Sequence, residues 1–172
     1  MRCCGTYTLL LLLAIFQTIA FILIVVATPP DVFRSWDSNV CYSLFGEKKS
    51  CGRYGGSVKS SSWGCERRES TMNAAAAFAI ISIAFSLIAT IMAFLAYFRL
   101  CFVRLGLFIM TLLTAITLLI SWACIADVYH KPMCGSSAGL KSTYSYGPAF
   151  GLIVFTWVLE VFLFILAVIV TF

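Results

Sequence analysis

The chain has 172 residues and a formal net charge of +5, and 62% of its residues are hydrophobic while only 11% are charged. This composition excludes a soluble domain and indicates a chain embedded in a lipid bilayer, with no nucleic acid among its partners. Four apolar stretches, at about residues 7–27, 73–98, 105–126 and 149–172, are each long enough to cross the ~30 Å hydrocarbon layer as a helix. Continuous apolar runs do not form a membrane β-barrel, so we expect an all-α membrane protein: one membrane domain over residues 1–172, built as a four-transmembrane-helix bundle.

The first apolar stretch has two interpretations. Arg2 could be the basic head of a cleaved signal peptide, with Val25-Val26-Ala27 as its cleavage site. The apolar run from Leu9 to Ala27 is, however, longer than the ~7 to 15 residues usual for a signal core. The length therefore favours a retained transmembrane helix.

The segment at about residues 28–72 is the only connection long enough to fold on its own. Within it, Cys41 and Cys51 enclose nine residues that contain a glycine and a charged turn. This is the spacing of a disulfide-closed β-hairpin, with candidate strands around residues 40–45 and 51–54. We expect a small disulfide-stapled β-hairpin domain here.

Residues 41–51 read Cys-Tyr-Ser-Leu-Phe-Gly-Glu-Lys-Lys-Ser-Cys. This block resembles the signature of the amastins, four-span surface proteins of kinetoplastid parasites, at Cys41, Tyr42, Ser43, Leu44, Phe45, Gly46, Lys48 and Cys51. Ser50 departs from the signature, because the family prefers an acidic, amide or Thr residue there. The resemblance extends to the four spans, the large first loop and the short inner turn. It implies a non-enzymatic multi-pass surface protein.

The chain is also distantly similar in arrangement to the claudins, whose first outer loop carries a Trp before a cysteine pair. Trp36 precedes Cys41 here, but no Gly-Leu-Trp triplet does. A barrier or pore function is therefore not implied.

Hydroxyl side chains form one stripe on each of the second and third spans, which the short turn at residues 99–104 makes antiparallel neighbours. The stripes are Ser82, Ser86 and Thr90, and Thr111, Thr114, Thr117 and Ser121. They could line a hydrophilic path, but contacts between helices are the simpler interpretation, because small and hydroxylated residues mediate helix packing in lipid.

Glu160 is the one acidic residue deep in a span, and Gln17 stands at a matching depth in the first span. A hydrogen bond between Gln17 and a protonated Glu160 would satisfy this intramembrane polar pair. The alternative is a small transporter or channel that is proton-linked through Glu160. No Gly or Pro interrupts the middle of the spans, as the broken helices of transporters would require, so a structural pair is favoured.

The basic residues and the cysteines disagree about sidedness. The two longer connections, at about residues 28–72 and 127–148, hold nine Lys and Arg, so the positive-inside rule would place them in the cytosol. The first of them also carries five acidic residues and the Cys41/Cys51 pair, which the cytosol would keep reduced. We therefore expect both connections to be extracellular loops, and both termini to be cytoplasmic at the plasma membrane.

The remaining cysteines divide between the two faces. Cys65 and Cys134 could tie the two outer loops together as a second disulfide, although sequence does not fix the connectivity of Cys65, Cys124 and Cys134. Cys124 lies within the third span and suits a buried small apolar position. On the inner face, possible acylation sites are Cys3, Cys4 and Cys101.

Other chemistry is sparse. His130 is the only histidine, and with Asp127 and Cys134 it lacks the repeated spacing of zinc ligands. We identify no catalytic, cofactor-binding or metal-binding residues, and neither Asn39 nor Asn73 lies in an Asn-x-Ser/Thr sequon. The sequence thus predicts an interaction or membrane-organising protein of the parasite surface, whose partners beside the bilayer are an unknown surface protein, glycan or lipid, or further copies of the chain.

Overall fold

The computed structural model describes residues 3–36, 40–48, 51, 63, 65–98, 101–135 and 140–171. Four long helices dominate these ranges: α1 (Cys3–Ala27), α2 (Glu66–Tyr97), α3 (Cys101–His130) and α4 (Pro148–Thr171). Each contains a stretch long and apolar enough to cross a membrane. The predicted fold class, a bundle of four transmembrane helices, is confirmed.

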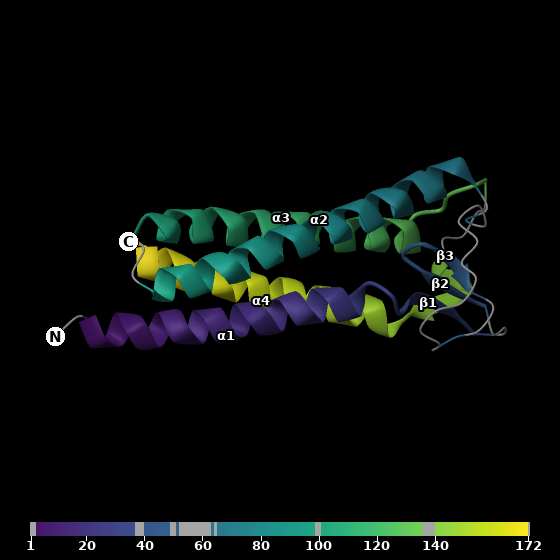
Figure 1. The fold of residues 1–172 in the computed structure, drawn as a ribbon. Coiled ribbons are helices and arrows are strands. Elements are labelled where there is room, and N and C mark those ends of the chain that lie inside the picture. The colour runs from purple at the N-terminus through teal and green to yellow at the C-terminus, as the bar shows by residue number, and fades with distance from the viewer. Residues whose placement is uncertain are drawn as a thin grey trace.

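The four helices lie side by side, and each one packs against two neighbours (Figure 1). The pairs in contact are α1 with α2, α2 with α3, α3 with α4, and α4 with α1. On α2, small residues fill the interior face at Ala75, Ala79, Ala89, Ala93 and Ala96, while large apolar side chains such as Ile80 and Ile91 face outward. Small residues let helices approach closely in lipid, which explains why this alanine face lies inward.

A four-stranded antiparallel sheet covers one end of the bundle, opposite the first turn of α1 and the last turn of α4 (Figure 1). Its strands are β1 (Asp31–Ser35), β2 (Cys41–Ser43), β3 (Gly46–Lys48) and β4 (Tyr144–Tyr146), in the order β3-β2-β1-β4. β4 comes from the second long connection, directly after the 3-10 helix η2 (Leu140–Ser142). The sheet therefore joins the two loops that the sequence predicted to share one side of the membrane.

The predicted hairpin is present as β2 and β3, but its second strand is earlier than expected. β3 ends at Lys48, and Cys51 lies in a turn after it. Residues 52–54, expected in a strand, lie outside the described residues. The reason for the shift is the tight turn at Leu44 and Phe45, which reverses the chain before the charged residues.

Two helices extend beyond the apolar stretches that predicted them. α2 begins at Glu66 and α3 ends at His130, so both reach into the sheet region. Glu66 and Glu69 lie in the first turn of α2, where carboxylates interact favourably with the helix dipole. A single buried apolar cluster runs from the bundle into the sheet and includes Ile24 and Ala27 of α1, Phe33 of β1 and Leu44. The sheet is therefore packed directly on the end of the bundle.

Candidate functional site

The turn between β2 and β3 is built from the signature residues. Ser43 pairs with Gly46 across the hairpin, and the Ser43 hydroxyl donates to the Gly46 carbonyl oxygen at 3.1 Å. The Ser43 hydroxyl oxygen in turn accepts a hydrogen bond from the backbone N–H of Phe45 at 3.3 Å. Gly46 has a φ of 142°, a conformation that residues with a Cβ rarely adopt. Ser43 and Gly46 therefore fix the turn in which Leu44 and Phe45 lie.

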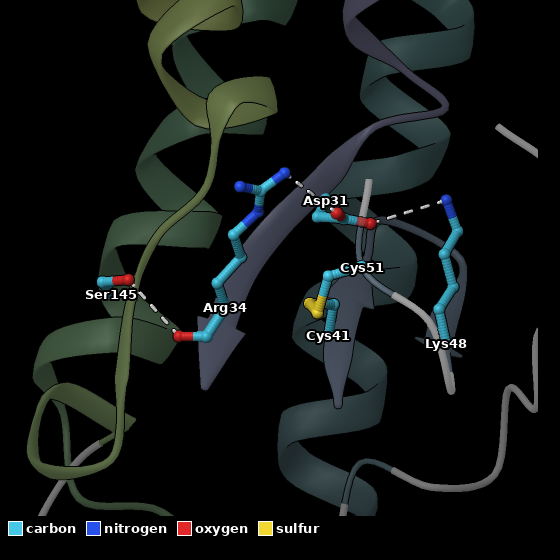
Figure 2. Close-up of a disulfide and its surroundings, with 6 residues drawn as sticks. All are labelled: Asp31, Arg34, Cys41, Lys48, Cys51 and Ser145. Atoms are coloured by element: carbon cyan, nitrogen blue, oxygen red, sulfur yellow. Dashed lines mark hydrogen bonds and ion pairs between the residues drawn. A yellow bond between two sulfur atoms is a disulfide. The ribbon is translucent and has the colours of Figure 1, made fainter. Parts of the chain in front are cut away.

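Lys48 connects the hairpin to the segment between α1 and β1. Its Nζ donates to the carbonyl oxygen of Pro29 at 2.6 Å and lies 3.8 Å from Oδ1 of Asp31 (Figure 2). Asp31 is also 3.5 Å from the guanidinium of Arg34 through Oδ2. Lys48 and Asp31 are 4% and 1% exposed, so this ion pair is largely shielded from water. A buried charge has to be paired, and here the pairing ties β3, across β2, to the first residue of β1 and to the segment after α1.

Tyr42, the second signature residue, packs in an aromatic group. Its ring stacks on Trp63 with 4.6 Å between centroids and meets Tyr144 of β4 edge-on at 5.4 Å. Burial, together with the nearby Tyr144 and Glu47, raises the pKa of Tyr42 to about 12. The neutral phenol is therefore the form that the folded sheet favours.

Two disulfides hold this end of the molecule together. Cys41 is bonded to Cys51, as predicted, with the two Cα atoms 5.5 Å apart (Figure 2). Cys65, just before α2, is bonded to Cys134, just after α3, with 5.4 Å between Cα atoms. This second bridge links the two long connections of the chain. Among the cysteines whose side chains are described, Cys124 in α3 is free and partly buried.

The predicted acylation sites lie outside what the structure describes. The side chains of Cys3, Cys4 and Cys101 are not among the described ones, so their acylation stays a prediction.

Inside the bundle the structure brings Gln17 and Glu160 together. Gln17 Nε2 donates to Glu160 Oε1 at 2.9 Å, and the hydroxyl of Ser86 donates to the same oxygen at 3.3 Å. All three side chains are fully buried. The group joins α1, α2 and α4. Ser86 as its third member was not predicted, although it stands in the hydroxyl stripe of α2 at the same depth.

The reciprocal half of the predicted Gln17–Glu160 bond is not formed. Within the described part of the chain, Gln17 Oε1 and Glu160 Oε2 have no hydrogen-bond partner. The three-residue group is therefore held by donors that converge on one carboxyl oxygen.

The hydroxyl residues of both stripes are buried, as residues that mediate helix packing should be, although most of their hydroxyls donate within their own helix. The hydroxyls of Thr111, Thr114 and Thr117 donate to carbonyl oxygens of their own helix. Ser121 is different, because its hydroxyl donates to the carbonyl oxygen of Ala75 in α2 at 2.9 Å. Back-bonding to the preceding turn satisfies a hydroxyl without a partner helix, so a stripe of hydroxyl residues does not by itself predict hydrogen bonds between helices.

In the sequence, His130, Asp127 and Cys134 lack the repeated spacing of zinc ligands. Asp127 forms an ion pair with Lys131, Cys134 is in a disulfide, and His130 meets the ring of Tyr129 edge-on. Over the described ranges, no group of three or more His, Cys, Asp or Glu side chains could hold a metal ion.

The fold and the site together define a four-span membrane protein with a disulfide-tied sheet on one end of its bundle. A protein-family model described as Amastin surface glycoprotein matches residues 18–167. The chain therefore belongs to the Amastin family, as its signature predicted. No curated protein matches the sequence closely.

Proposed function

We propose that this protein is a non-enzymatic surface protein that presents the disulfide-tied sheet outside the plasma membrane, for cell-surface interaction or membrane organisation at the parasite surface. The observation that carries the proposal is the Cys65–Cys134 bridge, which makes one covalently closed unit of the two outer loops. A unit built this way presents a fixed surface, because four strands, two disulfides and the ends of α2 and α3 restrain it together.

The proposal includes an orientation. Disulfides persist on the oxidising side of a membrane, and both bridges lie at the sheet end of the bundle. The start of α1 and the end of α4 lie at the other end (Figure 1). We therefore propose cytoplasmic termini, against the count of basic residues.

Part of that basic count has a local explanation. Lys48 is buried and paired with Asp31, and Lys131 is paired with Asp127. These two lysines therefore have structural roles in the folded loops. The orientation itself is proposed from the two disulfides.

The experiment is capture of surface partners on intact cells. The tagged protein is cross-linked with a membrane-impermeant reagent, and partners recovered with the native chain are compared with those of the Cys41→Ser/Cys51→Ser form. Cys124→Ser is the matched control, because Cys124 is free and lies within helix α3, so its replacement breaks no disulfide. We expect the native chain and the control to recover the same surface partners and the double variant to lose them. Equal recovery by all three forms, each present at the surface in equal amount, would contradict the proposal.

A further inference from the structure

The turn between β2 and β3 lies close to the end of the bundle at which α1 ends. β1 begins four residues after the end of α1, and Ser43 is the register partner of Asp31, the first residue of β1. The chain turns immediately after Ser43, so Leu44 and Phe45 are directed back toward the end of α1. Trp36 follows Ser35, the residue at the other end of β1.

Leu44 and Phe45 have opposite environments. Leu44 is 0% exposed and belongs to the same apolar cluster as Ile24 and Ala27, which are in the last turn of α1. Phe45, the next residue, is 42% exposed. One side chain of the turn is thus inserted into the end of the bundle, and the other points away from the protein at the same level.

The surface beside this level already faces lipid. The candidate span of α1 runs to Ala27, and Val25 and Val26 in its last turn are exposed large apolar residues. The interfacial layer of a bilayer extends only ~5 to 8 Å beyond each side of the hydrocarbon core. A turn that packs on the last turn of a span therefore lies within reach of the glycerol and headgroup region.

We propose that Phe45 inserts into the bilayer interface and anchors the sheet to the leaflet that it faces. Its partner is the lipid surface itself, because the exposed ring lies in a turn next to the start of β1, close to the last turn of α1, where Val25 and Val26 are also exposed. Ser43 and Gly46 set the turn that aims it, and Lys48 holds the hairpin to the end of α1 through Pro29. In this arrangement the signature residues 41–51 fix the height and tilt of the sheet above the membrane. The inference does not depend on which leaflet the sheet faces, and so does not rest on the proposed function.

The test places a fluorescent reporter at the turn. Phe45→Trp retains an aromatic ring, and Trp suits the membrane interface. The full chain is reconstituted in phosphatidylcholine vesicles that contain lipids brominated near the glycerol end of the acyl chains. The emission of residue 45 is the difference between Phe45→Trp and the native chain. The matched control is the emission of Trp36, obtained as the difference between the native chain and Trp36→Phe. Trp36 is 72% exposed and follows the end of β1 that is farther along the chain from α1.

We expect brominated lipid to remove most of the emission from residue 45 and little from Trp36, and we expect aqueous iodide to do the reverse. Emission from residue 45 that iodide quenches and brominated lipid does not would overturn the proposal, because the turn would then face water. Emission shielded from both quenchers would also overturn it, since protein would then cover the ring.

A second measurement uses the native chain and needs no substitution. Vesicles that contain a photoactivatable phospholipid with its reactive group near the glycerol are irradiated, and the labelled peptides are identified by mass spectrometry. We expect label on Phe45 and on Val25 and Val26, and none on Trp36. Label on α1 without label on the β2–β3 turn would contradict the proposal.

Discussion

Removing the Cys41–Cys51 disulfide should open the signature hairpin. The bonded residues are 10 positions apart, and for a loop of that length the chain-entropy expression gives about 2.7 kcal/mol of stabilisation. This corresponds to an increase of about 100-fold in the population of the open hairpin in Cys41→Ser/Cys51→Ser. The short strands β2 and β3, of three residues each, cannot compensate by pairing alone.

The same expression is less suited to the other bridge. Cys65 and Cys134 are 69 positions apart, for which a flexible loop would give about 4.4 kcal/mol. Most of that loop is α2 and α3, which stay helical in the bilayer because their backbone groups have no other hydrogen-bond partners there. Their conformational freedom is already restricted, so the second bridge should stabilise by less than this figure. The first bridge therefore gives the sharper prediction.

The assay is trypsin cleavage after Lys48, followed by mass spectrometry of reduced peptides. Lys48 is 4% exposed and bound to Pro29, so cleavage at this bond requires the hairpin to open. When opening is fast compared with cleavage, the cleavage rate follows the open population. We expect the rate to rise by about 100-fold in the double variant and to be unchanged in Cys124→Ser. Equal rates in the native chain and the double variant would refute the reasoning, because packing and the Lys48–Asp31 pair alone would then hold the hairpin.

Three further changes test other parts of the structure. In the bundle, Glu160→Gln should leave thermal stability in vesicles nearly unchanged. Glu160→Leu should lower the stability by ~1 to 2 kcal/mol, because Gln17 loses its 2.9 Å partner. A proton flux that Glu160→Gln abolishes would instead support a transporter. In the sheet, the raised pKa of Tyr42 means that its stabilisation is fully present below the ordinary value of 10.0 and is lost as pH rises toward about 12. Near-ultraviolet circular dichroism should show this loss in the native chain, and less of it in Tyr42→Phe. Gly147→Ala should separate β4 from β1, because a Cβ at Gly147 would lie 2.1 Å from the carbonyl oxygen of Asp31; amide hydrogen exchange in β1 that stays as slow as in the native chain would contradict this.

Hydropathy sufficed to predict the bundle, because four continuous apolar runs leave few alternatives in a membrane. The cysteine spacing likewise predicted the hairpin, since the bond joins residues close in sequence. The other two strands, β1 and β4, were missed for the opposite reason. β4 is three residues long and pairs with β1 more than 100 positions away, as Phe33 with Tyr146, so local pattern carried no signal for it.

The difference between local patterns and long-range contacts also explains which contacts of the candidate site the sequence predicted. Matching depth on two helices was enough to predict the pairing of Gln17 with Glu160. It was not enough for Lys48, whose partners Pro29 and Asp31 depend on how the hairpin folds back on α1. Trp63 was also missed, because its stacking on Tyr42 is a tertiary contact that local sequence pattern does not show.

The measurement that most directly tests the account is the sidedness of the sheet. An epitope inserted near Gly56, in the first long connection, is compared on cells with the same epitope placed after Phe172, beyond α4. We expect antibody to reach the Gly56 epitope on intact cells and the Phe172 epitope only after permeabilisation. The reverse pattern would put the disulfide-tied sheet in the cytosol and contradict the central claim.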